Sequence, residues 1–282
     1  MLRDAGLEIR QGGLELGGVD ALLCMLTDRI DEERLARADR LRIVANMAAG
    51  TDNIDLEAAR QRGIVVTNTP DVLTDATADL AFGLLLAVAR RLAWGDRLVR
   101  AGGFGGWSPT LGIGLDVSGR TLGIVGAGRI GRAVAERASG FRMRVLETRR
   151  QGGLPLHQLL EQADFVSLHV PLTTETRHLI GEPELRHMRR HAVLINTSRG
   201  AAVDEAALVR ALEGGWIAGA GLDVFEHEPR LAPGLASLSN VVLAPHVGSA
   251  TRATRARMAE IAARNVVAAL HGEPLPNPIV GP

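Results

Sequence analysis

Short runs of apolar residues recur along this chain, separated by longer segments in which apolar residues return at helical spacing. The runs predict buried strands, and the amphipathic segments between them predict helices. The predicted strands cover residues 18–26, 41–47, 64–68, 143–148, 164–170, 192–197, 218–224 and 240–245, and a further strand opens the segment 121–141. The predicted helices cover residues 31–39, 53–63, 74–102, 157–163, 182–190, 204–215 and 252–272. Because strands and helices alternate at this spacing, the sequence predicts an α/β fold with a parallel, doubly wound sheet.

The longest of these segments, residues 74–102, is interpreted as one continuous helix. Its apolar residues nearly encircle the helix axis, so we expect most of its surface to be buried against other elements. The glycine- and proline-rich stretch 102–114 follows it and is typical of a loop.

Charge and cysteine content exclude several classes of partner. The formal net charge is zero, which gives no reason to expect a nucleic acid. The longest apolar run, residues 80–89, is too short to cross a bilayer, and the first residues lack the apolar core of a secretory signal, so no membrane partner is expected. Cys24 is the only cysteine and has no internal disulfide partner, which predicts a reducing compartment, the cytoplasm.

The basic residues restrict the chemistry further. All 32 of them are arginine, and the chain contains neither lysine nor tyrosine. A lysine Schiff base, a P-loop lysine and a Tyr/Lys pair are therefore excluded. An acid–base group must be His, Asp, Glu or Cys. His246 is a candidate, because it stands between Pro245 and Gly248 shortly after the apolar run 241–243.

The sequence GAGRIG at residues 126–131 is a G-x-G-x-x-G that follows a predicted strand and opens a predicted helix. In this context it predicts a dinucleotide site. Gly126 permits the turn, Gly128 lets the backbone approach the pyrophosphate, and Gly131 allows the helix to pack closely on the strand. Arg129 and Ile130 lie between these glycines at the start of the helix.

The end of the next strand should discriminate between NAD and NADP. An acidic residue about twenty positions after the glycines binds the ribose hydroxyls, whereas arginine at this place receives a 2′-phosphate. The sequence contains both, with Glu147 inside the strand and Arg149 and Arg150 at its end. The two arginines favour NADP(H) over NAD(H).

Two histidines four residues apart, His187 and His191, have the spacing of a metal-binding pair. They have neither a third ligand nor an accompanying glutamate base, so we interpret them as part of a solvated helix face and predict no metal site.

Six stretches together resemble one family. They are TPDVLTDATADLAFGLLLAVAR, GIVGAGRIG, HVPLTTETRHLI, LINTSRGAAVDEAAL, AGAGLDVFEHEP and APHVGSAT, and they are similar to the D-2-hydroxyacid dehydrogenases, nearest to the glyoxylate/hydroxypyruvate reductase branch. The similarity runs from about residue 19 to the C-terminus. The resemblance implies a Rossmann-type nucleotide-binding domain, residues 76–248, inserted in a smaller flavodoxin-like substrate domain, residues 1–75 and 249–282. It also implies a homodimer.

The resemblance assigns roles residue by residue. It implies that Arg199 holds the substrate and that Glu228 and His246 form an acid–base pair. It further implies that the backbone amides of Ala49 and Gly50 bind the substrate carboxylate, and that Trp107 reaches the active site of a neighbouring subunit. The residues that line the nicotinamide half of the cofactor would be Thr77, Val170, Asp223 and Gly248.

A 2-oxo acid suits these residue types. A planar guanidinium can contact both the carboxylate and the ketone, and an imidazolium can donate the proton as hydride arrives. A neighbouring carboxylate favours the charged imidazole. The expected activity is the NAD(P)H-dependent reduction of a small 2-oxo acid, glyoxylate or hydroxypyruvate, to the D-2-hydroxy acid.

The chain departs from the family pattern in two places. The family's first strand has no counterpart, so the substrate domain is expected to be truncated at its N-terminus unless residues 7–10, LEIR, substitute. The passage 148–158 is also shorter than usual. Three alternatives therefore stay open: another 2-hydroxy acid as substrate, a cofactor-sensing corepressor that acts as a scaffold, and a degraded relative that folds poorly.

Overall fold

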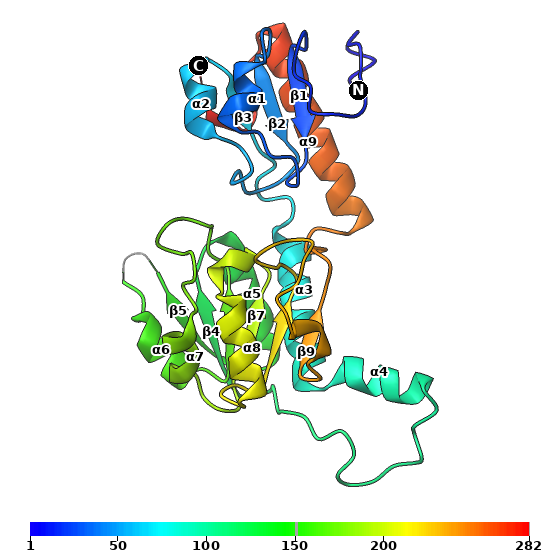
Figure 1. The fold of residues 1–282 in the computed structure, drawn as a ribbon, viewed down its shortest axis with the longest axis vertical. Helices are drawn as coiled ribbons and strands as arrows, with labels where there is room; N and C mark the ends of the chain where they lie inside the picture. The colour runs from blue at the N-terminus through cyan, green and yellow to red at the C-terminus, as the bar shows by residue number, and fades with distance from the viewer. Residues whose placement is uncertain (150–151, 282) are drawn as a thin grey trace. The chain divides into compact units, whose positions relative to one another are not determined.

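The computed structural model describes residues 1–149 and 152–281 (Figure 1). The chain divides into two compact units. The first, here called the terminal unit, comprises Met1–Leu73 and Ser249–Pro282, and the second, the central unit, comprises Thr74–Gly248.

The terminal unit is built on a four-stranded sheet with the order β1-β2-β3-β10. Its strands are β1 (Ala21–Cys24), β2 (Ile43–Asn46), β3 (Val65–Thr67) and β10 (Pro278–Val280), and its helices are α1 (Glu32–Ala36), α2 (Leu56–Gln61) and α9 (Arg252–His271). The first three strands are parallel, and β10 pairs antiparallel with β3. Three of the predicted helices thus have their counterparts, and Asp31, Asp55 and Thr251 cap their N-termini by accepting backbone N–H bonds.

Residues 7–10 form no strand, so the alternative in which LEIR substitutes for the family's first strand is excluded. Glu8, Ile9 and Arg10 are exposed, and this segment therefore buries no apolar face that could hold it in the sheet.

The central unit contains the predicted doubly wound sheet, with six parallel strands in the order β5-β4-β6-β7-β8-β9. The strands are β4 (Thr121–Val125), β5 (Arg144–Thr148), β6 (Phe165–Leu168), β7 (Val193–Asn196), β8 (Gly219–Leu222) and β9 (Val241–Leu243). The helices are α3 (Thr74–Ala89), α4 (Leu92–Arg100), α5 (Arg129–Gly140), α6 (Leu156–Gln162), α7 (Glu182–His187) and α8 (Glu205–Glu213), with short 3₁₀ turns at Gly200–Ala202 and Leu235–Ser237. Because β4 lies between β5 and β6, the chain reverses its direction of winding at the carboxyl end of β4, where ligands bind in such sheets.

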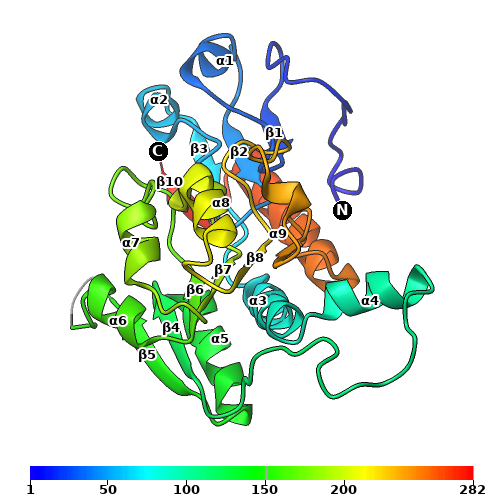
Figure 2. The same ribbon diagram turned by 60° about the horizontal axis from the view of Figure 1, so that its bottom comes forward.

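Helices α3 and α5 lie on one face of this sheet and α6, α7 and α8 on the other (Figure 2), and each face carries its own apolar core. On one face, Phe82 and Leu85 of α3 and Val134 of α5 pack on alternate strand residues such as Ile195. On the other face, α6, α7 and α8 contribute Leu159, Leu185 and Leu208, which pack on the intervening residues of the same strands. Burial on both faces explains why the strands appear in the sequence as continuous apolar runs.

The predicted single helix over 74–102 is in fact two helices, α3 and α4. Arg91 lies between them with φ 52°, a left-handed conformation that interrupts the helix. Helix α3 is buried in the core, as expected, whereas α4 has no buried residue. Among the helices of the described residues, none is both long and apolar enough to cross a membrane.

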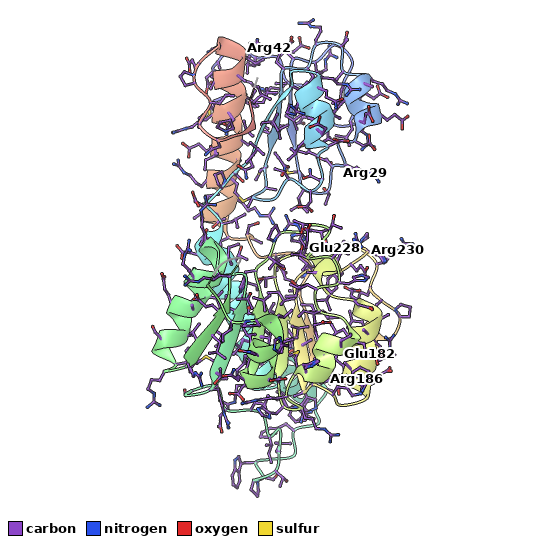
Figure 3. All side chains as sticks on the ribbon, turned by 90° about the vertical axis from the view of Figure 1, so that its left-hand side faces the viewer. Arg29, Arg42, Glu182, Arg186, Glu228 and Arg230 are labelled. Atoms are coloured by element: carbon purple, nitrogen blue, oxygen red, sulfur yellow. The ribbon has the colours of Figure 1, made fainter. Side chains whose placement is uncertain are left out.

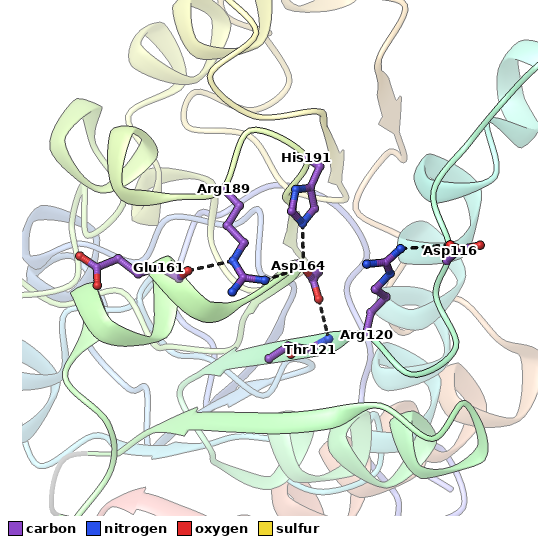
Figure 4. Close-up of polar contacts among 7 residues, drawn as sticks. All are labelled: Asp116, Arg120, Thr121, Glu161, Asp164, Arg189 and His191. Atoms are coloured by element: carbon purple, nitrogen blue, oxygen red, sulfur yellow. Dashed lines mark hydrogen bonds and ion pairs between the residues drawn. The ribbon is translucent and has the colours of Figure 1, made fainter.

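A buried carboxylate joins the amino ends of three central strands (Figure 4). Asp164 accepts hydrogen bonds from the Thr121 amide at 2.8 Å, from Arg189 at 2.9 Å and from His191 at 2.7 Å. Burial would raise the pKa of Asp164, but the bonds from His191, the Thr121 amide and Arg189 outweigh it and lower the pKa. This cluster fixes the edge of the sheet opposite to the carboxyl ends of its strands.

Candidate active site

Five of the loops that follow strands of the central sheet carry residues that the sequence singled out. Gly126 follows β4, Val170 follows β6, Arg199 follows β7, Asp223 follows β8 and His246 follows β9. Since all six strands are parallel, their carboxyl ends lie along one edge of the sheet, and the fold gathers these residues there.

The glycine turn between β4 and α5 has the geometry that a dinucleotide requires. Gly126 has φ +94°, and a Cβ there would lie 2.7 Å from the carbonyl oxygen of His169. A Cβ on Gly131 would overlap the Gly126 carbonyl oxygen, so this glycine permits the close packing of α5 on β4. Gly128 caps α5 without a side chain.

The space beside Gly128 is open enough for a pyrophosphate to come close to the backbone. Apart from Gly128 and its two chain neighbours, no atom of the described residues lies within 4 Å of a Cβ built on Gly128, and this glycine is exposed at the N-terminus of α5 together with Arg129. Helix N-termini favour anions because their first N–H groups have no partner within the helix. Ile130, the next residue, is half-buried against the core beneath.

Three of the residues predicted at the nicotinamide half come together. A Cβ on Gly248 would lie 3.2 Å from Oδ2 of Asp223 and 3.4 Å from the side chain of Thr77. Val170 lies instead beside the glycine turn, because a Cβ on Gly126 would lie 2.9 Å from its Cγ1.

The end of β5 contains an acid and a base that are bound to each other. The guanidinium of Arg149 donates two hydrogen bonds to Oε2 of Glu147, at 2.9 and 2.5 Å. Glu147 is largely covered, with 22% of its side chain exposed, whereas Arg149 is 55% exposed. Arg150 lies outside the described residues.

The pair that the sequence predicts as acid and base is in contact. Nδ1 of His246 lies 2.9 Å from Oε2 of Glu228. Each side chain is about one-third exposed, so a small molecule can reach the pair. The second carboxylate oxygen of Glu228 accepts the backbone N–H of Phe225 at 3.0 Å, and the loop that carries Glu228 and Arg230 is marked in Figure 3.

The environment of Glu228 favours its ionised form. Burial raises the pKa of this carboxyl, but the hydrogen bonds from His246 and the Phe225 amide and the positive charges of His246 and Arg199 together lower the pKa below its ordinary value. An ionised Glu228 accepts a hydrogen bond from Nδ1 of His246 and so holds that side of the ring. The Nε2 side is then the one that can transfer a proton.

His246 is held in a left-handed backbone conformation, with φ 55°. Asp223 fixes this turn through three bonds. Its carbonyl oxygen accepts the His246 amide at 2.8 Å, and its two carboxylate oxygens accept the amides of Val247 at 2.7 Å and Gly248 at 2.8 Å. Burial raises the pKa of Asp223 in opposition to these bonds. A strained residue held by its surroundings in this way is typical of a functional site.

Arg199 lies on a turn that is organised by Asn196, a residue that the sequence analysis did not identify. Asn196 is buried at the end of β7, and its side chain donates to the Arg199 carbonyl oxygen at 2.9 Å while it accepts from Ser198. Arg199 itself donates to the Ser198 carbonyl oxygen at 2.8 Å. An asparagine at the end of an otherwise apolar run was the signal available in the sequence.

In the terminal unit, the loop after β2 has its peptide groups fixed by two asparagines. Asn68 donates to the carbonyl oxygen of Ala49 at 2.7 Å, and Asn46 donates to that of Gly50 at 2.8 Å. In a trans peptide the N–H points away from the C=O. The Ala49 carbonyl and the Gly50 N–H belong to the same peptide group. The bond from Asn68 to this carbonyl oxygen therefore orients the Gly50 N–H away from Asn68.

Trp107, which the resemblance assigns to the active site of a neighbouring subunit, is 83% exposed on the loop after α4.

The two histidines that have the spacing of a metal-binding pair lie in different surroundings. His187 ends α7 and contacts the Pro183 carbonyl oxygen, whereas His191 lies beyond the helix and binds Asp164. The interpretation of this pair as one solvated helix face is therefore wrong, because α7 ends before His191. Within the described part of the chain, no group of three or more His, Cys, Asp or Glu side chains could hold a metal ion.

Comparison with known proteins agrees with this fold. The family described as D-isomer specific 2-hydroxyacid dehydrogenase, NAD binding domain, matches residues 82–248. The glyoxylate reductase of Thermococcus litoralis is 54% identical over 274 residues, which cover 92% of this chain and 83% of that protein. Among solved structures, a protein of Thermus thermophilus superimposes with a TM-score of 0.94 at 50% identity, covering 99% of this chain and 95% of its own. The NADPH-dependent glyoxylate/hydroxypyruvate reductase of Sinorhizobium meliloti, in complex with NADP and malonate, superimposes with a TM-score of 0.85 at 37% identity, covering 98% and 87%.

These likenesses cover nearly the whole chain and include the nucleotide-binding sheet with its glycine turn. The chain therefore belongs to the D-isomer specific 2-hydroxyacid dehydrogenase family. It is an oxidoreductase that uses a nicotinamide cofactor and acts on 2-oxo or 2-hydroxy acids.

Proposed function

We propose that the protein reduces glyoxylate or hydroxypyruvate to the corresponding hydroxy acid, with NADPH preferred over NADH. The observation that carries this proposal is the 2.9 Å contact between His246 and Glu228, on loops of the sheet edge that also bears the dinucleotide turn and Arg199. The relatives whose printed names are glyoxylate reductase support the choice of substrate.

In this mechanism the nicotinamide, when bound, supplies the hydride. Arg199 binds the carboxylate of the 2-oxo acid and polarises its ketone, because a guanidinium can contact two oxygens at once. His246 donates its Nε2 proton to the ketone oxygen, and Glu228 orients the ring through its contact with Nδ1.

The preference for NADPH rests on Arg149. Its guanidinium is more than half exposed at the end of β5, where it can receive a 2′-phosphate, while its partner Glu147 is mostly covered. A second negative charge at this position would compete with Glu147 for the arginine, so binding of NADPH exchanges one ion pair for another. The relative with NADP bound supports the same choice.

The assay that tests the function follows absorbance at 340 nm with glyoxylate or hydroxypyruvate and with NADPH or NADH in parallel. The wild type is expected to oxidise NADPH with the higher kcat/KM. Arg149→Gln is expected to raise the KM for NADPH by about tenfold, in keeping with one lost charge-assisted bond, and to leave the KM for NADH nearly unchanged. Arg142→Gln, a change at an exposed arginine outside the site, is the matched control. A wild type that binds NADPH and melts cooperatively but reduces neither acid would contradict the proposal and favour a scaffold.

We further propose that the protein works as a homodimer formed through α4 and the loop after it. This arm exposes six large apolar side chains: Leu92, Val99, Phe104, Trp107, Leu111 and Ile113. A cavity of about 360 Å³, lined in part by Val88, Trp94 and Val242, lies at its base. Apolar patches of this kind on a globular unit mark interaction sites, and a second copy of the chain would bring an equivalent arm.

Sedimentation velocity tests the dimer. The wild type is expected to sediment as a dimer at micromolar concentration, and Phe104→Asp is expected to shift it to monomer, because an introduced carboxylate would be buried without a partner. Ile9→Asp, a change of the same kind at an exposed residue of the terminal unit, should leave the dimer intact. A wild type that stays monomeric would show that the arm has another role.

A further inference from the structure

The loop that carries Glu228, residues 225–232, is fastened at both ends by one buried carboxylate. Glu205 is the first residue of α8 and is 3% exposed. Its Oε1 accepts the backbone N–H of Glu226 at 2.8 Å, and its Oε2 accepts that of Ala232 at 3.3 Å. Glu228 lies between these two anchor points.

The hydrogen bonds of Glu205 hold the loop in place, and they do not cap the N-terminus of α8. The N-terminus of α8 is already capped by Asp204, which accepts the Ala207 amide at 2.9 Å. The carboxylate of Glu205 instead accepts from two amides that follow β8 in sequence. It therefore links α8, which follows the Arg199 turn, to the loop that bears the partner of His246.

The same loop also packs against the residue that follows Arg199. A Cβ on Gly200 would overlap the backbone of Phe225 and Glu226, so the two segments are in close contact. The side chain of Glu226 adds a bond to His178 at 2.6 Å, which secures the beginning of the loop a second time. The far end, at Ala232, has the contact with Glu205.

Burying a carboxylate costs free energy, which an apolar side chain that only fills space would not incur. Burial raises the pKa of Glu205, and the bonds from the Glu226 and Ala232 amides oppose this rise. What a carboxylate offers here, and a glutamine does not, is two acceptor oxygens. Both oxygens are used, and both act on the loop of Glu228.

We propose that Glu205 is a positioning residue for the reaction, which sets the Glu228 carboxylate against Nδ1 of His246 by holding both ends of the 225–232 loop. This inference rests on the proposed function, in which that pair supplies the proton. Displacing Glu228 by a fraction of an ångström would weaken its contacts with His246 and with the Phe225 amide, and it would misalign the imidazole.

The variant that tests this is Glu205→Gln, which keeps the size of the side chain and removes one acceptor. The amide retains the Glu226 bond or the Ala232 bond but not both, since its NH₂ group would face a donor at the other. Glu213→Gln is the matched control, the same change at an exposed residue of the same helix.

Two readouts are expected to change in Glu205→Gln. The kcat for glyoxylate reduction falls between about 10- and 100-fold with little change in the KM for the cofactor, because the proton donor is misaligned. The pKa of Glu228 rises toward its ordinary value, since the bonds that lower it are weakened. Glu228 must be ionised for reduction, so the acid limb of the kcat/KM profile moves to higher pH.

The pKa of Glu228 is measured in the protein without cofactor, by ¹³C NMR titration of the labelled glutamate carboxyls with Glu228→Gln for assignment. This readout does not depend on turnover. A wild type without reductase activity would overturn the proposed function, while a raised Glu228 pKa in Glu205→Gln would still support the positioning role. A folded Glu205→Gln with wild-type kcat, pH profile and Glu228 titration would overturn the inference and leave Glu205 a purely structural residue.

Discussion

Replacing His246 by glutamine is expected to lower kcat for 2-oxo acid reduction by about 10²–10⁴-fold, the usual contribution of a positioned general acid. Glutamine is similar in size and can hydrogen-bond to the ketone oxygen and to Glu228, but it has no proton to transfer. Cofactor binding should be retained, because the glycine turn lies on a different loop. The measurement is kcat at 340 nm together with the Kd for NADPH from protein fluorescence.

His187→Gln is the control for this variant, since His187 is an exposed histidine that contacts only the Pro183 carbonyl oxygen among the hydrogen bonds of the described residues. It should leave kcat unchanged. If His246→Gln kept more than a tenth of the wild-type kcat, the proton would have to come from another group, and the assignment of His246 would be wrong.

Replacing Arg199 by glutamine is expected to lower kcat/KM for glyoxylate by about 10²–10³-fold, the range seen when one strong donor to a developing oxyanion is removed. The guanidinium binds the substrate carboxylate and also polarises the ketone, so both KM and kcat should suffer. The pKa of Glu228 should rise as well, because the charge of Arg199 contributes to lowering it. The acid limb of the pH profile then moves to higher pH.

The control for Arg199 is Arg190→Gln, a change at an exposed arginine in the turn before β7. Thermal melting of both variants distinguishes a lost substrate contact from a disturbed turn, since Asn196 holds the Arg199 backbone whatever the side chain is. An Arg199→Gln protein that melts like the wild type and reduces glyoxylate with a normal KM would contradict the proposed binding role.

The sequence predicted the architecture well because its signals are local. Apolar runs such as 193–196 are buried on both faces of a parallel sheet and stand out from the amphipathic helices around them. The roles of Gly126 and Gly131 could be inferred from the amino-acid sequence alone, because positive φ and close packing demand glycine wherever they occur. The resemblance to a family then gave each loop a role.

The features that the sequence did not predict depend on backbone conformation or on contacts between distant residues, which residue type and spacing do not record. The break at Arg91 depends on a single left-handed residue within a segment of uniformly helical composition, and no local residue type predicts it. His191 was grouped with His187 by spacing, but its partner is Asp164, 27 positions away in the sequence. Residues 7–10, the open alternative for the family's first strand, form no strand because their exposed side chains supply no buried face.

The sequence by itself determined that this chain forms a parallel α/β sheet with a dinucleotide turn, and it pointed to the residue types that act there. Only the tertiary structure decided which side chains meet. His246 and Glu228 are 18 positions apart, and the contact of Glu205 with the Ala232 amide spans 27, so no periodicity records them. They meet because the carboxyl ends of parallel strands lie at one edge of the sheet, which brings the following loops together. Buried donors and acceptors in these loops then form hydrogen bonds with one another.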